Sequence, residues 1–321
     1  MGAASNLRFE PATEPSQSIS ARMLRLWCAP GTILAVTNLG DEEALLFHLI
    51  RQARRSSAKV LLAHVLQSSR VRADPRQLPQ RAESSRVVES AQESLTRMAQ
   101  QLRWVGIPCE PLLLRGSAAN EISLVAEARG AQRLLMLGAC AKDGGDGAPK
   151  TLAEELLPRI SIPICTVGQH GLALPQLAAS AARVTLALSL ESDAELPLAF
   201  ASRLAQEHKA QLTVVHVFGR DDKVRDGSGR TPLAVASRLP ANRLREAELL
   251  CPLEIAIRTG DPATEILKFG AGTDQDLIVL GPAGLPRPVP AGNSSVVHRV
   301  ITEARCPVIV LGQSMRRSAF D

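Results

Sequence analysis

The sequence predicts an α/β protein made of two successive copies of an open parallel sheet that is flanked by helices. The chain has 321 residues, more than a single hydrophobic core usually organises. Short apolar runs alternate with segments whose apolar residues recur at helical spacing, as in parallel sheets with helices on both faces. Motifs of the first half also return in the second half, about 144 residues later. These three observations fix the expected fold class.

Five apolar runs predict the strands of the first copy. The first run, Thr32 to Thr37, is rich in β-branched residues, which favour strands. The remaining strands are expected at 59–66, 111–114, 133–137 and 163–167, and the connecting helices at 41–56, 83–103, 116–128 and 151–160. Because the runs are apolar throughout, we expect strands that are buried on both faces, as in parallel sheets.

The internal repeat sets the domain boundaries. Equivalent residues of the two copies are Gly116 and Gly260, 144 apart, Gly138 and Gly281, 143 apart, Pro163 and Pro307, 144 apart, and His64 and His216, 152 apart. The larger last offset implies a connector about eight residues longer in the first copy, and a period this long indicates domains, since solenoid repeats span about 20–50 residues. We therefore predict an N-terminal extension (1–30), a first domain (31–168), a linker (169–182), a second domain (183–313) and a C-terminal tail (314–321).

Composition excludes several classes of protein. Apolar residues make up 45% of the chain and charged residues 21%, as in ordinary soluble globular proteins. The net charge of +5 would allow contact with a polyanion. However, the arginines are dispersed, and a chain with no Tyr, two Trp and six Phe offers few platforms for base stacking. We therefore do not expect nucleic-acid binding.

The sequence shows no targeting or membrane segment. No apolar run reaches the roughly 20 residues that span a bilayer. The N-terminal segment carries Glu10 and Glu14 and has no continuous apolar core, so it does not resemble a secretory signal. We expect a cytoplasmic protein.

The six cysteines do not suggest a metal site or a disulfide framework. They contain no C-x-x-C pair and no neighbouring His at ligand spacing. Cys165 and Cys306 lie in or beside apolar runs, so we expect them to be small buried residues. No metal is predicted.

The segment from 277 to 311 carries the candidate binding chemistry. It reads as a strand, a Gly/Pro-rich loop, a helix and a second strand. Gly281 and Gly284 can adopt positive φ and let the backbone approach a ligand. Ser294 or Ser295 precedes the helix, whose N-terminus presents unpaired N–H groups to a phosphate. An ordinary strand-to-helix connection with a serine cap explains the same residues.

These motifs resemble those of a two-domain universal stress protein. The resemblance rests on Gly260-Asp-Pro-Ala263, on the stretch from Leu280 to Leu311 and on the tandem repeat, and it covers about residues 32–168 and 183–312. It implies a Rossmann-like or flavodoxin-like fold with a five-stranded parallel sheet in each copy. Members of this family often pair through their last strand. The resemblance thus implies an intramolecular pseudo-dimer in which 163–167 pairs with 307–311, which would cover two apolar edges, and a possible homodimer of whole chains.

The resemblance also names a candidate nucleotide site in the second copy. Members of the family that bind ATP carry a loop of the form G-x2-G-x9-G-[ST]. The second copy matches it at Gly281, Gly284 and Ser295 but has Ser294 in place of the last glycine. The candidate nucleotide-binding residues are Ser189, Val217, Gly260, Gly281, Gly284, Ser294, Ser295 and Val296.

The first copy departs further from the ATP-binding pattern. The equivalents in this degenerate loop are Asn38, Val65, Gly116, Gly138, Lys150 and Thr151. Asn38 and Ser189 stand where ATP binders carry an aspartate for the nucleoside, and losing such a buried hydrogen bond costs roughly 1–3 kcal/mol. ATP is therefore the one cofactor considered, and only in the second copy.

The remaining polar residues have structural explanations. His64 and His216 lie within apolar strands without a recurring nucleophile, so we expect satisfied histidines and not catalytic bases. His298 and Arg299 follow Ser295 by one helical turn and could face either a phosphate or solvent. Thr151 and Glu154 form a capping-box pattern, for which no further role is expected.

These observations favour a non-catalytic stress-response protein that binds unknown protein partners and has degenerate nucleotide loops. One alternative is a Rossmann-like ATP-using enzyme of the adenine-nucleotide hydrolase type. It would need carboxylates or metal ligands at the carboxyl ends of the strands. The second alternative is a basic protein that binds nucleic acid, and its binding would have to persist above about 0.2 M salt.

Overall fold

The computed structural model describes residues 5–9, 31–40, 42–66, 80–137, 151–167, 183–188, 195–218, 251–269, 276–281 and 295–312. The chain divides into two compact units. One comprises residues 27–137, and the other comprises residues 1–26 and 138–321. Each unit is described separately.

The sheet of the unit 27–137 is parallel. Its strands are β2 (Thr32–Val36), β3 (Lys59–Leu66), β4 (Cys109–Arg115) and β5 (Arg133–Leu137), in the spatial order β5-β2-β3-β4. β2 and β5 are buried along their whole length. The strands therefore lie where the apolar runs predict them, with small differences at their ends.

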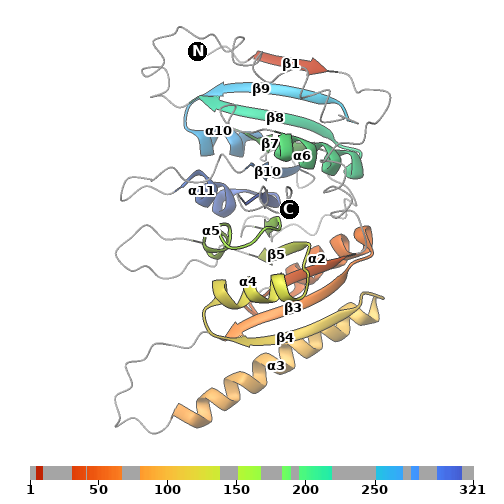
Figure 1. Ribbon diagram of the computed structural model, residues 1–321, viewed down its shortest axis with the longest axis vertical. Helices are drawn as coiled ribbons and strands as arrows, with labels where there is room; N and C mark the ends of the chain where they lie inside the picture. Colours follow the sequence, from red (N-terminus) through yellow and green to blue (C-terminus); the bar gives the residue numbers. More distant parts are fainter. Residues whose placement is uncertain are drawn as a thin grey trace. The chain divides into compact units, whose positions relative to one another are not determined.

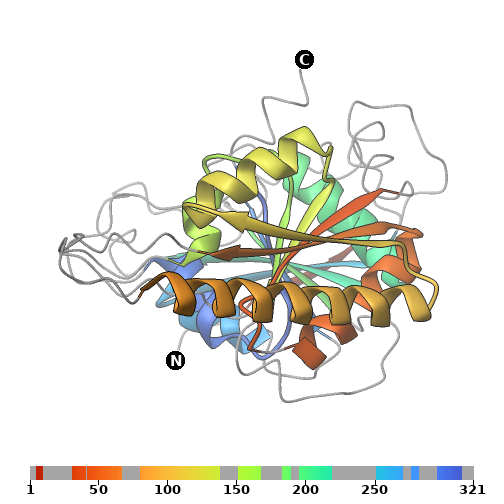
Figure 2. The same cartoon turned by 90° about the horizontal axis from the view of Figure 1, so that it is seen from below.

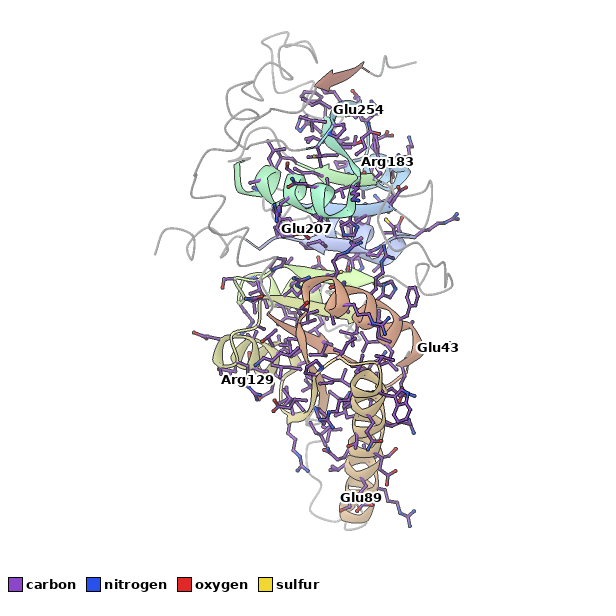
Figure 3. The ribbon with its side chains drawn as sticks, turned by 90° about the vertical axis from the view of Figure 1, so that its right-hand side faces the viewer. Glu43, Glu89, Arg129, Arg183, Glu207 and Glu254 are labelled. Carbon is purple, nitrogen blue, oxygen red and sulfur yellow. The ribbon has the colours of Figure 1, made fainter. Side chains whose placement is uncertain are left out.

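Helices cover both faces of this sheet. They are α2 (Glu42–Ser56), α3 (Gln80–Trp104) and α4 (Ala118–Ala128). Figure 2 shows α3 on one face and α4 on the other. Figure 3 labels three exposed residues of this unit: Glu43 on α2, Glu89 on α3, and Arg129 at the end of α4. No helix among the described residues is both long and apolar enough to cross a membrane.

The second unit repeats this topology. Its parallel strands are β7 (Arg183–Ala187), β8 (Gln211–Phe218), β9 (Leu253–Thr259), β10 (Asp276–Leu280) and β11 (Val308–Val310), in the order β9-β8-β7-β10-β11. Its helices are α5 (Leu152–Leu156), α6 (Glu195–His208), α10 (Pro262–Phe269) and α11 (Val296–Glu303). The order β9-β8-β7-β10, which Figure 1 labels, matches the order β4-β3-β2-β5 of the other unit. The duplication inferred from the motifs is thus a duplication of structure.

The last strands of the two repeats pair with each other. β6 (Ile164–Val167) runs antiparallel to β11, with Cys165 opposite Ile309. The hydroxyl of Thr166 also donates to the carbonyl oxygen of Val308 at 3.3 Å. Because Ile309 is the equivalent of Cys165 at the repeat offset of 144, an approximate two-fold axis passes through this pair. The pairing expected from the family resemblance is present.

The N-terminal extension contains a strand that the sequence did not predict. β1 (Ser5–Phe9) pairs antiparallel with β9, with Leu7 opposite Ile255. At the two ends of β9, the carbonyl of Pro252 and the N–H of Gly260 form hydrogen bonds with β8. Alternation along the strand therefore turns the N–H of Ile255 outward, toward β1. This pairing depends on a residue about 250 positions away, so local periodicity carries no signal for it.

The corresponding edge of the first repeat is protected in another way. β4 bonds to β3 through the carbonyl of Pro108 and the N–H of Gly116, so Pro111 presents its nitrogen at the outer edge. Pro111 is the equivalent of Ile255 and has no N–H to donate. Proline on an edge strand opposes the addition of a further strand. Only the second repeat thus offers a continuous row of donors to β1.

Leu7→Pro removes the β1 donor opposite Ile255. We expect the amide of Ile255 to exchange with solvent at least about tenfold faster in this variant, because its partner strand is displaced. The amide of Ala256, which points toward β8, should keep its protection. Native-state hydrogen exchange measures both amides, with Leu7→Val as the control. Equal exchange of Ile255 in both variants would show that β1 does not hold this edge.

Candidate functional site

The candidate site of the second repeat begins at the carboxyl ends of two adjacent strands, β7 and β10. The N–H of Gly281 donates to the carbonyl of Ala187 at 3.1 Å, and the N–H of Leu188 to that of Val215 at 3.0 Å. β7 lies between β8 and β10, so the connections leave it in opposite directions. Such a reversal point is the usual place for a ligand crevice in parallel α/β sheets.

Gly281 serves packing at this point. It is buried, and its φ is not positive, unlike the φ values of Gly116 and Gly260. A Cβ at Gly281 would lie 3.1 Å from Leu188 Cδ1 and 3.4 Å from Pro197 Cβ. The proposed use of positive φ is therefore wrong for Gly281, which allows the close approach of α6 to the sheet.

Among the candidate site residues, Gly116 and Gly260 have the positive φ that favours glycine. Their φ angles are +140° and +152°, and each precedes a helix at the end of its strand. A Cβ would lie 2.8 Å from an oxygen of Glu121 in the first repeat and 3.3 Å from an oxygen of Glu265 in the second. The positive φ accounts for glycine at both positions, whereas the flexible glutamate side chains could move away from a Cβ.

The two strand histidines hold the ends of neighbouring strands. His64 Nδ1 lies 2.8 Å from the carbonyl oxygen of Thr37, and His216 Nδ1 lies 3.0 Å from that of Leu188. Since a carbonyl only accepts, each Nδ1 carries the proton in these hydrogen bonds. The expectation of satisfied histidines is confirmed.

The other candidate residues divide into described and undescribed positions. Val65 and Val217 follow the histidines and are half-buried, and Asn38 is exposed, with its Oδ1 accepting from Gly40 N–H at 2.9 Å. Asn38 therefore stabilises a turn. Ser189, Gly284, Ser294, Gly138 and Lys150 lie outside the described residues.

Ser295 caps α11, as the sequence predicts. The next residue, Val296, is half-buried. Its Oγ accepts from the N–H of His298 at 2.9 Å. The same hydroxyl donates to Glu154 Oε1, and His298 Nδ1 lies 3.0 Å from Glu154 Oε2. Glu154 belongs to α5 of the first repeat, so a carboxylate from the other repeat occupies the start of the helix that could face a phosphate.

Glu154 also completes the capping box of its own helix. Its Oε2 accepts from the N–H of Thr151 at 2.9 Å and from Thr151 Oγ1 at 3.1 Å. The capping box is thus confirmed, but the expectation that Glu154 has no further role is wrong. The contact with α11 spans more than 140 residues. Only superposition of the repeats, which places Thr151 with Ser295 and Glu154 with His298, could have suggested it.

These contacts determine the ionisation of Glu154. Burial raises the pKa of the carboxyl, but hydrogen bonds from Ser295, Thr151 and His298 outweigh burial. The pKa is therefore lowered from its usual value, and the group is a carboxylate at neutral pH.

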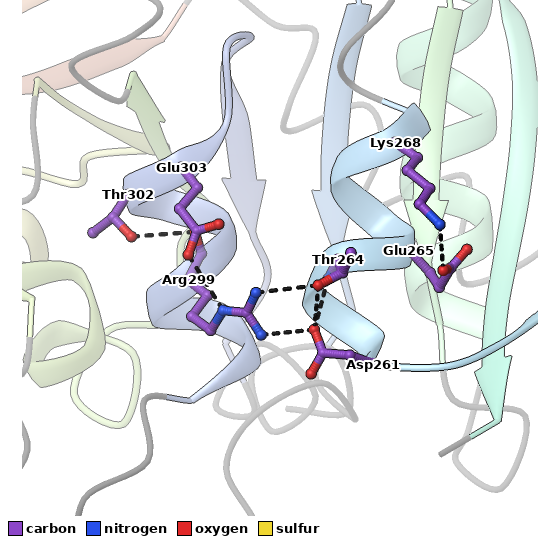
Figure 4. Close-up of polar contacts among 7 residues, drawn as sticks. All are labelled: Asp261, Thr264, Glu265, Lys268, Arg299, Thr302 and Glu303. Atoms are coloured by element: carbon purple, nitrogen blue, oxygen red, sulfur yellow. Dashed lines mark hydrogen bonds and ion pairs between the residues drawn. The ribbon is translucent and has the colours of Figure 1, made fainter. Parts of the chain in front are cut away.

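Arg299 is likewise engaged within the protein. Its Nη1 donates to Asp261 Oδ2 at 2.6 Å and its Nη2 to Thr264 Oγ1 at 3.2 Å, which connects α11 to the start of α10 (Figure 4). Its Nε donates to Glu303 at 3.2 Å. Burial raises the pKa of Asp261, but hydrogen bonds from Thr264 and Arg299 lower it below its usual value. His298 and Arg299 thus face internal carboxylates, which neither sequence interpretation anticipated.

The described cysteines are not reactive centres. Cys109, Cys165, Cys251 and Cys306 are all buried, and none of the four forms a disulfide bond. Burial raises the pKa of Cys109 and of Cys306 to about 12, so both thiols stay protonated at neutral pH. In the described part of the chain, no three His, Cys, Asp or Glu side chains form a group that could hold a metal ion.

The fold and the site define a tandem protein of the Rossmann-like α/β class, and the comparisons identify its family. The model of the universal stress protein family matches residues 31–146 and 181–312. This chain therefore belongs to the universal stress protein family. It is 33% identical over 135 residues to a universal stress protein of Thermus aquaticus, a match that covers 40% of this chain and 96% of the relative.

Solved structures agree with this fold. A universal stress protein from Archaeoglobus fulgidus superposes with a TM-score of 0.61 at 20% identity, covering 88% of this chain and 98% of its own. A protein of unknown function from Pseudomonas aeruginosa gives a TM-score of 0.57 at 13% identity, covering 92% and 98%. These matches span both repeats.

Glu154→Gln tests the carboxylate that joins α5 to α11. We expect the free energy of unfolding at pH 7.5 to fall by about 1–3 kcal/mol, the usual range for hydrogen bonds to a charged group. Because the pKa of Glu154 is lowered in the folded protein, its stabilisation is present above its usual pKa of 4.5 and is lost as the pH falls through the lowered value. Chemical denaturation across this range should show the two proteins converging in acid.

The control is Glu89→Gln, which removes one exposed carboxylate on α3. Its denaturation midpoint should follow that of the wild type at every pH. A difference between wild type and Glu154→Gln that persists unchanged in acid would contradict the assigned role of the charge.

Proposed function

We propose that this universal stress protein is non-catalytic, has degenerate nucleotide loops and acts by binding protein partners. The observation that carries the proposal is the use of Ser295. Its hydroxyl both accepts from His298 N–H and donates to Glu154. The group that would bind a phosphate is occupied, and the adjacent negative charge opposes a second anion at the same helix end.

The first repeat supports the same proposal of a degenerate loop. Thr151 is buried, and its N–H and hydroxyl both serve Glu154. Lys150 and Thr151 stand where the ATP-binding pattern has Gly-[ST]. Both helix starts are therefore committed to the contact between the repeats.

A weak adenine-nucleotide site in the second repeat is the second candidate function. It is favoured by Ser295, a hydroxyl at the start of an eight-residue helix that follows the matching glycine Gly281. ATP or AMP bound there would have to displace Glu154 from Ser295 Oγ. Such a site would be weak for that reason.

The structure offers less to the other two functions. An ATP-using enzyme needs carboxylates or metal ligands at the strand ends, where Asn38, His64 and His216 make local hydrogen bonds. A nucleic-acid-binding surface needs unneutralised basic groups. Several described arginines instead pair with carboxylates, namely Arg97 with Glu42, Arg129 with Glu110, Arg203 with Glu207 and Arg299 with Asp261.

Calorimetric titration of Mg-ATP into the nucleotide-stripped full chain distinguishes the two candidate functions. For degenerate loops we expect no saturable heat up to about 1 mM ATP, which corresponds to binding weaker than about −4 kcal/mol. Saturable binding at one site that is lost in Gly284→Val would overturn this proposal and establish the second candidate. Release of phosphate from ATP at a measurable rate would overturn the non-catalytic assignment.

A further inference from the structure

The pairing of β6 with β11 defines a local, approximate two-fold axis between these two strands. Val308 faces Thr166, Ile309 faces Cys165 and Val310 faces Ile164. At the repeat offset of 144, Ile309 corresponds to Cys165, and the flanking pairs exchange under the same rotation. A residue on this axis faces its own equivalent.

Glu154 and His298 satisfy the same condition. They are 144 residues apart, so they are equivalent positions, and they contact each other with Oε2 and Nδ1 at 3.0 Å. Their side chains are only 11% and 13% exposed. The axis thus passes between two chemically different residues in a poorly hydrated place.

Pairing of like repeats would change this contact. Two first repeats would bring Glu154 against Glu154, and two second repeats would bring His298 against His298. Two carboxylates at this distance cannot both ionise at low cost, and two imidazoles cannot both be protonated. The helix caps beside this contact do not distinguish like from unlike repeats, because the equivalent residues Thr151 and Ser295 both present a hydroxyl.

Arg299, next to His298 on α11, is paired within its own repeat. Glu155 on α5 corresponds to Arg299 on α11, and Arg159, just after α5, corresponds to Glu303. Arg299 binds Asp261 and Glu303 within its own repeat. β6 and β11 contribute only Ile, Cys, Thr and Val residues to the pairing. Among the described residues, Glu154 and His298 are the equivalent positions at which an acid contacts a base.

We propose that Glu154 and His298 select the partner of each repeat. The pairing face of the first repeat is formed by α5 and β6. It pairs with a face that presents a proton donor at the axis, as the face formed by α11 and β11 does. It does not pair with a copy of itself. The pair therefore directs the repeats to join each other instead of like repeats of other chains.

Single substitutions in the full chain recreate both rejected pairings. His298→Glu places two carboxylates on the axis, and Glu154→His places two imidazoles there. At pH 7.5 we expect amides of β6 and β11 to exchange about tenfold faster or more in His298→Glu, as the pairing opens more often. Native-state hydrogen exchange of these amides in the intact protein is the measurement.

The exchanged pair, Glu154→His with His298→Glu, should restore protection to within about threefold of the wild type. The approximate symmetry predicts this rescue, since Glu at 298 would form with Ser295 the capping box that Glu154 forms with Thr151. Protection in the double variant equal to the product of the single effects would overturn the proposal. Should the single variants fail to fold, a folded double variant supports it, and an unfolded one overturns it.

The pH dependence distinguishes selection at the axis from a general loss of packing. Between pH 7.5 and 5, the defect of His298→Glu should shrink as the two carboxylates share a proton. The defect of Glu154→His should grow, because protonation would place like charges next to each other. Glu89→His, which makes the same change at an exposed site of α3, should show neither trend. Parallel pH trends in the two axis variants would overturn the proposal.

Discussion

The antiparallel contact of β6 with β11 is the constraint on which the described second unit depends. An exposed apolar strand edge invites other chains to add to it, and this contact covers two such edges at once. Thr166, Cys165, Val308 and Ile309 are all buried there. Each repeat also has a far edge, and the two far edges are protected differently. β1 pairs with the edge of β9, whereas β4 has Pro111, which lacks an N–H donor, at its edge.

Side chains of the candidate site that could serve a ligand or a reaction hold elements of the fold together. His64 and His216 fix strand ends, and Ser295, Thr151 and His298 surround one carboxylate. A catalytic group must be able to change protonation or partners during turnover. Here each such change would break a contact that joins two elements of the fold.

Apart from the β6–β11 pairing, which the family resemblance implies, the parts of this structure that the sequence predicts are those determined by neighbouring residues. The apolar runs at 32–37 and 133–137 appear as buried strands, and Thr151 with Glu154 forms the capping box that its spacing indicates. The missed features join residues far apart in the chain. β1 is defined by the edge of β9, and the second role of Glu154 is defined by α11. The role of Gly281 was mistaken because a glycine that leaves room for Pro197 looks the same in sequence as one that needs positive φ.

Joining two repeats in one chain changes what their contact can contain. In a symmetric dimer, a residue on the two-fold axis must face itself, so no single substitution can place an acid opposite a base. In a tandem chain the two copies of that position are separate residues, and here they are Glu154 and His298. The loop sequences can differ for the same reason, since the first copy carries Lys150 and Thr151 where the second carries Ser294 and Ser295. Asymmetry at the axis and unequal loops are therefore two results of one condition, the covalent union of the repeats.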